Sequence, residues 1–424
     1  MGQTTNSNFK ERINDTKCEE SYRILWIGMF ASEKHFNEMQ SKGFRQAAAQ
    51  LTQLNYINGI EHVLEAPIET LNGYVLPAYP KYSDWKIVES IWAHTEGSND
   101  ISVGFLNFKY INHISRTLSL EKAAMKWGMK NRNANNVKIL VYSMHSPYLS
   151  AARVLKKIIP NAKIYLIVPD LPQYMDTTMT CFKKIMKRVD WERIKKLMIC
   201  VDGYFIYTNQ MANYLNLTHD QWIRIEGSVN YKLIDEQNLL ENKYSKKVCV
   251  YAGALEGIYR LDIFIQSFIN ANIDDSELHI YGNGNLSREI EQLSNANKNI
   301  KYFGFCDNRE IIIAELKATL LVNPRPSSED YTKFSCPSKT LEYMVSGTPL
   351  LTTRLAGIPD EYFEYTFCIN DESLEGMTII LKEVLGKNRE ELHKKGMRAK
   401  QFMLTKKSNI VQAKKMLDFM KVDF

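Results

Sequence analysis

The residues best suited to chemistry lie in the C-terminal half of the chain, in the segment Pro337–Tyr343, which reads PSKTLEY. Pro337 suits the first turn of a helix, where its missing N–H breaks no hydrogen bond. The free amides of such a turn, at Ser338 among others, can hold phosphate oxygens, and Lys339 adds a positive charge. Glu342, one helical turn further on, can accept hydrogen bonds from two vicinal hydroxyls, as in a ribose. A plain helix start with solvated charges is the alternative, but it leaves Lys339 and Glu342 unexplained.

Two further groups lie where strands are expected to end. Gly253 follows the apolar run Val248–Ala252, and Arg260 falls within the first turns of the helix expected next. Amides at such a turn favour an anion such as a diphosphate, which Arg260 could reach. On its own, this pattern is more typical of an ordinary turn with a surface arginine. Phe305 follows another strand, where contact with a nucleotide base is expected.

Alternating strands and helices have to position these residues. Short β-branched and aromatic runs alternate with longer helical stretches, as in βαβ units on a parallel sheet. In the first half the expected strands are Tyr22–Gly28, Ile101–Leu106, Val137–Tyr142, Ala162–Val168 and Tyr204–Tyr207, with a helix at Tyr148–Ile159. In the second half they are Val248–Ala252, Glu277–Tyr281, Ile300–Phe303, Thr319–Val322 and Pro349–Thr352, with helices at Arg260–Asn270 and Ser338–Val345.

This pattern predicts an α/β protein of two Rossmann-like, doubly wound domains facing a central cleft, at residues 20–240 and 247–404. The charged segment 241–247, ENKYSKK, is the expected linker. Arg389–Met420 reads as amphipathic helix, and its end, from about residue 405 to 424, is expected to pack back on the N-terminal domain. The cleft, at the carboxyl ends of the strands, is the expected ligand site.

Composition narrows the class of protein. A chain of 424 residues is too long for one ordinary core, and its 45% hydrophobic and 24% charged residues are typical of a globular protein. No apolar run approaches the roughly 20 residues of a membrane span, and the polar first twenty residues do not resemble a secretory signal, so a cytoplasmic location is expected. Seven scattered cysteines without a Cys-x-x-Cys pair argue against a disulfide framework or a structural zinc site. A net charge of +6 is no nucleic-acid signature on its own.

The segment Val248–Tyr362 resembles the nucleotide-sugar domain of retaining glycosyltransferases of family 4, which have the GT-B architecture. The resemblance rests on the Pro337–Tyr343 motif and on Gly357–Tyr362, which reads GIPDEY. It is strongest for members with a Pro-Ser-Lys-x-x-Glu-Tyr motif that build bacterial capsules and other surface polysaccharides. It implies a nucleoside-diphosphate sugar as donor and neither metal nor other cofactor. The lack of an Asp-x-Asp motif at any expected strand end agrees with the last point.

The resemblance also implies roles for residues of the motif. Glu342 matches the glutamate that typically holds the ribose, and Ser338 and Lys339 match residues whose amides hold the diphosphate. The family usually has two glutamates in this region, and Glu342 matches the second. The first, which binds the sugar, is replaced here by Phe334. Contacts to the donor hexose would then fall to nearby residues: Glu329, Asp330 or Lys339.

In the first half the resemblance covers mainly strand ends. Gly28 corresponds to a family glycine that faces the diphosphate, although a plain turn glycine fits equally well. His145 is a candidate acceptor contact, and Asp170 stands where many members have a His-Asp pair, so it would orient or deprotonate the acceptor hydroxyl. Both residues also suit purely structural roles. Because the leaving phosphate is usually proposed to take the acceptor proton, stabilisation of the departing diphosphate matters most, and Arg260 and Lys339 are the residues expected to provide it.

Cys181–Met198 is a basic segment with seven Lys or Arg residues against two acidic ones. Its apolar phase shifts along the way, which predicts two short helices meeting near Asp190. Such a segment can rest on an anionic membrane surface, and the commoner alternative is a packed helix with a solvated face.

These features together predict a hexosyltransferase that uses a nucleotide sugar and a polyprenyl-linked saccharide acceptor, retains anomeric configuration and works at the inner face of the cell membrane. Two alternatives remain open. One keeps the fold but uses a soluble acceptor or another reaction, such as sugar-phosphate synthesis or phosphorolysis. The other is a catalytically inactive nucleotide-binding subunit, which the missing glutamate at Phe334 would suit. Base, sugar, acceptor and linkage are left open by the sequence.

Overall fold

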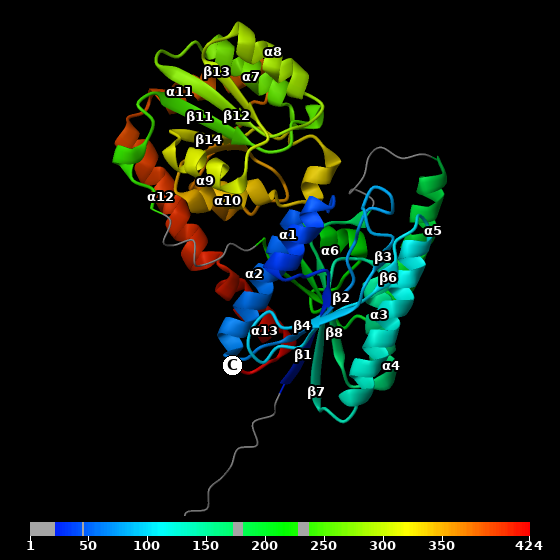
Figure 1. Cartoon of the computed structure of the whole chain (residues 1–424). Helices are drawn as coiled ribbons and strands as arrows, with labels where there is room; N and C mark the ends of the chain where they lie inside the picture. The colour runs from blue at the N-terminus through cyan, green and yellow to red at the C-terminus, as the bar shows by residue number, and fades with distance from the viewer. Residues whose placement is uncertain (1–21, 45, 173–180, 228–236) are drawn as a thin grey trace, which may run out of the picture.

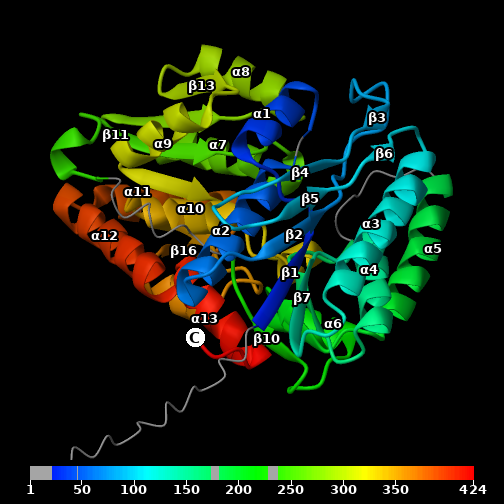
Figure 2. The ribbon, with the colours of Figure 1, turned by 60° about the horizontal axis from the view of Figure 1, so that its bottom comes forward.

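Two mostly parallel β-sheets carry the two halves of the chain, and helices cover both faces of each sheet (Figure 1). The computed structural model describes residues 22–44, 46–172, 181–227 and 237–424. The N-terminal domain contains the first sheet and the C-terminal domain the second. Figure 2 shows the same two domains from a second direction.

The N-terminal sheet has the strand order β10-β9-β8-β7-β1-β2-β5-β4. All neighbours are parallel except the edge strand β4, which runs antiparallel to β5. The strands are β1 (Tyr22–Gly28), β2 (Glu69–Asn72), β4 (Ser90–Trp92), β5 (Asp100–Ser102), β7 (Asn136–Tyr142), β8 (Lys163–Val168), β9 (Gly203–Ile206) and β10 (Trp222–Arg224), with β3 (Lys86–Ile87) and β6 (Phe105–Leu106) in a separate pair. The central strands are almost entirely buried, as expected for a parallel sheet covered on both faces.

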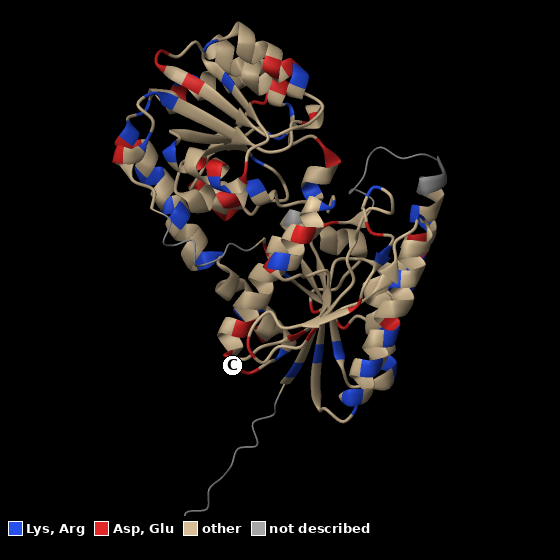
Figure 3. Ribbon diagram, in the orientation of Figure 1, with Lys and Arg blue, Asp and Glu red and all other residues tan. Residues whose placement is uncertain are grey.

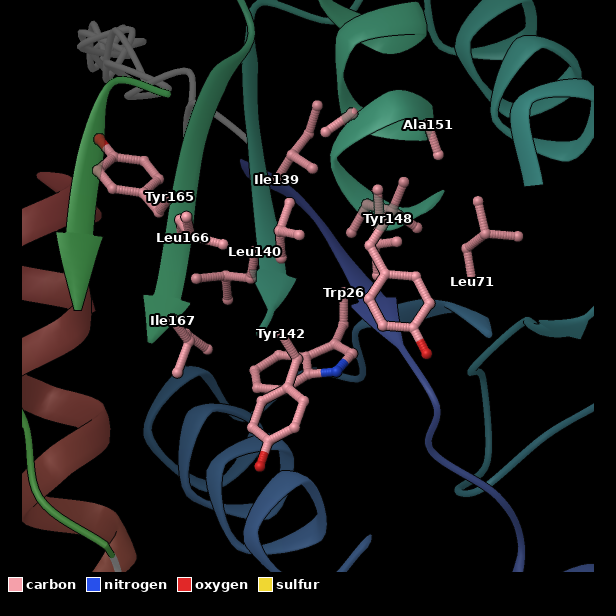
Figure 4. Packing of buried hydrophobic residues seen from close by; sticks show 14 of the residues in the cluster. Trp26, Leu71, Ile139, Leu140, Tyr142, Tyr148, Ala151, Tyr165, Leu166 and Ile167 are labelled. Atoms are coloured by element: carbon pink, nitrogen blue, oxygen red, sulfur yellow. The ribbon is translucent and has the colours of Figure 1, made fainter. Parts of the chain in front are cut away.

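Helices of the N-terminal domain lie on both sides of this sheet. They are α1 (Glu33–Ser41), α2 (Ala47–Leu64), α3 (Ile111–Lys130), α4 (Ser146–Ile158), α5 (Cys181–Met198), α6 (Asn209–Leu215) and α13 (Asn409–Met420). Trp26 of β1 stacks on Tyr142 of β7 and donates a hydrogen bond to Gln53 of α2, while Tyr148 of α4 packs on the opposite face (Figure 4). These contacts form one continuous core.

The C-terminal sheet is entirely parallel, in the order β13-β12-β11-β14-β15-β16. Its strands are β11 (Lys247–Ala252), β12 (Ser276–Tyr281), β13 (Ile300–Gly304), β14 (Leu320–Asn323), β15 (Leu350–Thr353) and β16 (Phe367–Ile369). Its helices are α7 (Leu261–Ala271), α8 (Ser287–Ala296), α9 (Asn308–Lys317), α10 (Ser338–Ser346), α11 (Leu374–Gly386) and α12 (Arg389–Lys406). One core packs around α7 and α11, and a second core packs around α10 and α12.

The C-terminal helical stretch returns to the N-terminal domain, but as two helices where one continuous stretch was expected. It breaks after Lys406, and Ser408 caps α13 by accepting a hydrogen bond from the Val411 amide. Helix α12 packs on α10, whereas α13 packs on α2. Gly59 of α2 allows this close approach, because an added Cβ would lie 2.5 Å from the Asn409 carbonyl oxygen.

A buried cation joins the domains at the break between α12 and α13. The Lys407 side chain is 4% exposed and lies 2.9 Å from the Glu226 carboxylate of the N-terminal domain. It also pairs with Glu361 of the C-terminal domain, and the Tyr362 hydroxyl donates to Glu226. Both domains therefore supply carboxylates to one buried ammonium group.

Most expected strands are present within a residue or two, but three local expectations were wrong. Ile101–Leu106 is divided between β5 and β6, which belong to different sheets. Cys181–Met198 is one continuous helix, not two. Segment 241–247, the expected linker, packs on the C-terminal domain, where Lys243 donates hydrogen bonds to the Leu316 carbonyl and Thr348.

Within the described ranges, each helix is either too short or too polar to span a bilayer.

Removing the Lys407 ammonium should leave the Glu226 carboxylate buried without its partner. A Lys407→Ala variant is expected to lose about 3–5 kcal/mol of stability, the usual cost of breaking a buried ion pair. The adjacent exposed Lys406 provides the matched control, Lys406→Ala, which should stay within about 0.5 kcal/mol of wild type. Chemical denaturation of the three proteins measures the difference, and equal effects of the two substitutions would contradict the role given to Lys407.

Candidate active site

The start of α10 is fixed against the ends of two neighbouring strands. The helix begins at Ser338, directly after Pro337, so its first amides lack helical acceptors. The Tyr343 hydroxyl accepts a hydrogen bond from the Ala252 amide at 2.7 Å and donates one to the Ala252 carbonyl at 3.0 Å. The Asn323 side chain donates to Thr340 Oγ1 at 3.1 Å. The helix start is thereby held beside the carboxyl ends of β11 and β14.

Lys339 and Glu342 form an ion pair on this helix. Lys339 Nζ lies 2.8 Å from Glu342 Oε2, and the two side chains are 28% and 40% exposed. Burial alone would lower the pKa of Lys339, but the carboxylates of Glu342 and Glu315 outweigh it and raise that pKa. Both groups thus present charge to solvent while each holds the other in place.

A third charged group, Glu315 of α9, lies behind this pair. Glu315 is 5% exposed, and its Oε1 atom accepts no hydrogen bond from the described residues. Burial raises the pKa of Glu315 to about 7, with the charge of Lys339 opposing the shift and that of Glu342 adding to it. Burial thus favours the protonated form of this carboxyl group.

The glycine turn after β11 packs against the turn after β12. An added Cβ on Gly282, whose φ is +126°, would lie 1.9 Å from the Gly253 carbonyl oxygen. Gly282 is therefore needed for this approach. Gly253 itself lies one residue beyond Ala252, to which Tyr343 ties α10, so the structure brings Gly253, Ser338, Lys339 and Glu342 to one edge of the sheet.

Arg260 lies on the α7 side of this turn, among acidic groups. Its guanidinium is 3.9 Å from the Glu372 carboxylate. The open pocket that it lines also contains three further acidic residues, Asp262, Glu289 and Asp371. These acidic side chains disfavour binding of a diphosphate beside Arg260, in contrast to the expectation that Arg260 faces one.

Arg325, which the sequence did not single out as a site residue, lies just beyond β14. Its guanidinium carbon is 4.3 Å from the centre of the Tyr259 ring. Among the described residues it has no ion pair or hydrogen bond. The sequence shows Arg325 two residues after Asn323. It does not indicate that no acidic side chain would pair with this arginine.

The residues expected near the donor sugar and base are largely at the surface. Phe334, which stands in place of the family's first glutamate, packs edge-on against Tyr214 of the N-terminal domain, with 5.7 Å between ring centres. Glu329 and Asp330 are exposed, and Asp330 pairs with Lys333 at 2.7 Å. Phe305 is 80% exposed beyond β13.

Gly28, at the end of β1, has a packing reason to be glycine. An added Cβ would lie 2.2 Å from Gln53 Oε1, the atom that accepts hydrogen bonds from Trp26 Nε1 and the Met29 amide. The close contact of Gly28 is therefore with α2 of its own domain.

His145 is held in place at the start of α4. Burial, together with Arg116 and His113, lowers the pKa of His145 well below its ordinary value, so the ring is neutral. Its Nε2 lies 3.3 Å from Arg116 Nη2. A guanidinium only donates, so Nδ1 carries the ring proton, and Nδ1 has no partner in the described part of the chain.

Asp170 follows β8 and remains open to solvent. Protein atoms around it nevertheless desolvate the carboxyl group and raise its pKa. Accessibility combined with desolvation is what a general base needs, although no described residue bonds to it.

The strand ends of the two domains face each other. Gln210 of α6 donates to the Ala356 carbonyl, and Arg224 of β10 donates to the Gly357 carbonyl. The start of α6 and the end of β10 therefore contact the loop after β15. Across residues 22–44, 46–172, 181–227 and 237–424, no three His, Cys, Asp or Glu side chains gather as a set of metal ligands.

Comparison with known proteins agrees with this geometry. Residues 246–385 match a family model described as Glycosyl transferases group 1. Sucrose-phosphate synthase from Thermosynechococcus elongatus superposes with a TM-score of 0.62 at 12% identity, covering 95% of this chain and 98% of that one. The chain has the GT-B fold. HepE from Anabaena, solved in complex with UDP, shares this GT-B fold with a TM-score of 0.58 at 11% identity, over 94% and 99% of the two chains.

A third GT-B neighbour is an α,α-trehalose-phosphate synthase (UDP-forming) from Burkholderia xenovorans, solved with glucose-6-phosphate. It has a TM-score of 0.62 at 10% identity and covers 94% of this chain and 100% of its own. No curated protein matches the sequence. The domain match and the GT-B fold support a place in the glycosyltransferase superfamily and indicate a transferase.

The buried carboxyl group of Glu315 predicts a pH-dependent cost to stability. Its pKa is about 7 in the folded protein against an ordinary value of 4.5, so the folded state binds the proton more tightly and loses stability as pH rises across that interval. Glu315→Gln should therefore raise the thermal unfolding midpoint at pH 8 clearly more than at pH 5. Glu310→Gln, at an exposed position of the same helix, is the control and should show no such trend. An equal gain at both pH values for Glu315→Gln would refute the argument.

Proposed function

We propose that this protein transfers a hexosyl group from a nucleoside-diphosphate sugar to a saccharide acceptor, with retention of anomeric configuration and without a metal ion. One observation carries the proposal: a helix start with free amides and the Lys339–Glu342 pair, tied by Tyr343 to the glycine turn at the carboxyl edge of a parallel sheet. This edge is where ligands bind in open α/β sheets.

The donor would occupy both charged groups of the pair. Glu342 accepts hydrogen bonds from the ribose hydroxyls, and the amides of Ser338 and Lys339 hold the diphosphate. Lys339 then neutralises charge on the phosphate, as expected for an electrostatic contribution to leaving-group departure. Exposed Phe305 is the proposed stacking contact for the base, and Glu329 and Asp330 remain the proposed contacts for the hexose.

The acceptor would bind on the N-terminal side. Asp170 combines accessibility with a raised pKa, which suits it to orient the acceptor hydroxyl. His145 is a second proposed acceptor contact, and its Nδ1, which is buried without a partner among the described residues, would have to be uncovered for that contact. Arg260 would have to leave Glu372 before it could contribute to the leaving group, so its proposed part is secondary to that of Lys339.

The finer proposal is a lipid-linked acceptor, and an apolar and basic surface supports it. The outward face of α3 carries five apolar side chains that are 44% to 61% exposed: Ile111, Ile114, Leu118, Met125 and Met129. Lys122, Lys126 and Lys130 are also exposed on this helix, whereas its acidic residue Glu121 is partly buried and accepts a hydrogen bond from Ser150. Figure 3 shows the basic residues along α3, α4 and α5.

Helix α5 extends the same surface. Ile185, Met186 and Val189 are 46% to 65% exposed. Asp190 of α5 accepts a hydrogen bond from Ser146 at 2.6 Å, and Ser146 lies 3.1 Å from His113 of α3. The exposed apolar and basic residues of α3 and α5 are called here the α3–α5 ridge. Its mixture of apolar and cationic groups complements an anionic bilayer at the inner face of the cell membrane, with the sites facing the lipid-linked acceptor.

A soluble acceptor is the second candidate. The structural neighbours with sucrose-phosphate synthase and trehalose-phosphate synthase in their names favour it. Incubation of the purified protein with a panel of nucleotide sugars, first without acceptor and then with lipid-linked or soluble saccharides, separates the candidates. Nucleotide binding with neither hydrolysis nor transfer would instead support an inactive nucleotide-binding subunit.

Glu342 should determine recognition of the ribose. Glu342→Ala is expected to weaken binding of the preferred nucleoside diphosphate by about 1.5–3 kcal/mol per lost charge-assisted hydrogen bond. Wild type should also prefer the ribonucleotide over its 2′-deoxy form, and the variant should lose that preference. Titration calorimetry measures both, with Glu383→Gln on the outside of α11 as control. A preference unchanged in Glu342→Ala would show that the ribose binds elsewhere.

The α3–α5 ridge should bind anionic vesicles. Wild type is expected to co-sediment with vesicles containing phosphatidylglycerol but not with pure phosphatidylcholine, and salt should weaken the binding. The double variant Ile114→Asp with Leu118→Asp should lose this binding and keep donor hydrolysis. Ile379→Asp alters a similarly exposed residue, 59% accessible, on α11 of the other domain and should bind like wild type. Binding that ignores lipid charge, or that Ile379→Asp reduces equally, would overturn the assignment.

A further inference from the structure

Three cations of the C-terminal domain are candidates to bind the diphosphate, and they differ in what neutralises them. Lys339 has Glu342 at 2.8 Å, and Arg260 has Glu372 at 3.9 Å. Arg325 alone of these three has no ion pair or hydrogen bond with any described residue. Its side chain is partly buried, so water does not fully replace a missing counterion. A partly desolvated guanidinium is stabilised most by a bound anion.

The position of Arg325 is fixed from two directions. Pro324 and Pro326 flank it and restrict the backbone. Asn323, two residues earlier, bonds to Thr340 in the first turn of α10. The backbone that carries Arg325 is therefore anchored to the helix start whose amides are proposed to hold the diphosphate.

Aromatic rings orient the Arg325 side chain. The guanidinium stacks over Tyr259, which lies in the short helix before α7, at 4.3 Å from the ring centre. Its charge also acts on the hydroxyls of Tyr251 and Tyr331, whose pKa values burial raises and Arg325 opposes. Tyr251 in turn donates to the Ala254 carbonyl in the glycine turn. Stacking on a ring leaves the N–H edges of a guanidinium free to donate.

We propose that Arg325 binds the donor diphosphate and stabilises it as it leaves. This inference rests on the proposed function and names the cation of that site. During transfer the bond between the anomeric carbon and the diphosphate oxygen breaks, and its electron pair stays on that oxygen. The acceptor oxygen forms the new bond to the anomeric carbon, and its proton passes to the diphosphate. Arg325 faces the oxygens on which the negative charge increases.

The test compares nucleotides that differ only in phosphate number. Wild type, Arg325→Ala and Arg325→Lys are titrated with the nucleoside diphosphate that wild type binds best and with the matching monophosphate. Arg325→Ala should weaken diphosphate binding by roughly 10- to 100-fold and monophosphate binding much less, as one lost charged hydrogen-bond group predicts. Arg325→Lys keeps the charge without the planar stack and should fall between the two. Donor hydrolysis should decline in the same order.

Two further variants distinguish the outcomes. Arg309→Ala, at an exposed position on α9, should match wild type. Arg260→Ala should lose less diphosphate affinity than Arg325→Ala, and the reverse order would overturn the inference. If both Arg325 variants bind the diphosphate as tightly as wild type, the inference about Arg325 is wrong and the proposed function is unaffected. Failure of the wild-type protein to bind any nucleoside diphosphate would overturn both.

Discussion

The relative position of the two domains depends on one buried ammonium group. Lys407 lies between Glu226 of one domain and Glu361 of the other, and Tyr362 donates a hydrogen bond to the first of these carboxylates. A buried charge is tolerated only when its partners stay in place. The backbone carbonyl of Glu226 also accepts a hydrogen bond from the Tyr56 hydroxyl, so the cluster is continuous with the N-terminal core. The same boundary carries the hydrogen bonds of Gln210 and Arg224 to the loop after β15, with the proposed donor residues on one side and the proposed acceptor residues on the other.

Much of the fold follows from local sequence. Continuous apolar runs such as Val137–Tyr142 and Val248–Ala252 are typical of strands buried on both faces, and both are strands here. The start of α10 was equally visible, because Pro337 was expected in its first turn; in the structure Pro337 lies directly before the helix, which begins at Ser338. What escaped were short strands of three or four residues, such as β10 and β16, whose pairing depends on neighbours far away in the chain.

The candidate site was less predictable, because charges are neutralised across tertiary contacts. Arg260 and Arg325 are both arginines after strand ends, and only the fold puts Glu372 beside the first and Tyr259 beside the second. Phe334 similarly looked like a gap in a sugar site, whereas the structure shows it packed on Tyr214 across the domain boundary. The exposed apolar face of α3 was not predicted. The sequence of a helix shows which residues are apolar, but not which of them another element covers.

The Lys339–Glu342 pair gives the proposed donor site a reason to prefer a whole nucleotide over its parts. A ribose that takes Glu342 leaves Lys339 short of a counterion, and a phosphate that takes Lys339 leaves Glu342 in the same state. Glu315 does not fully replace Glu342 as the counterion of Lys339, because burial raises the pKa of Glu315 to about 7, and as a carboxyl group it cannot replace Lys339. A ligand that carries a ribose and a diphosphate at the right spacing supplies both replacements at once. The ion pair is therefore expected to weaken binding of nucleosides and of free phosphate at the proposed donor site. A nucleoside diphosphate replaces both partners of the pair, and its binding should not be weakened in this way.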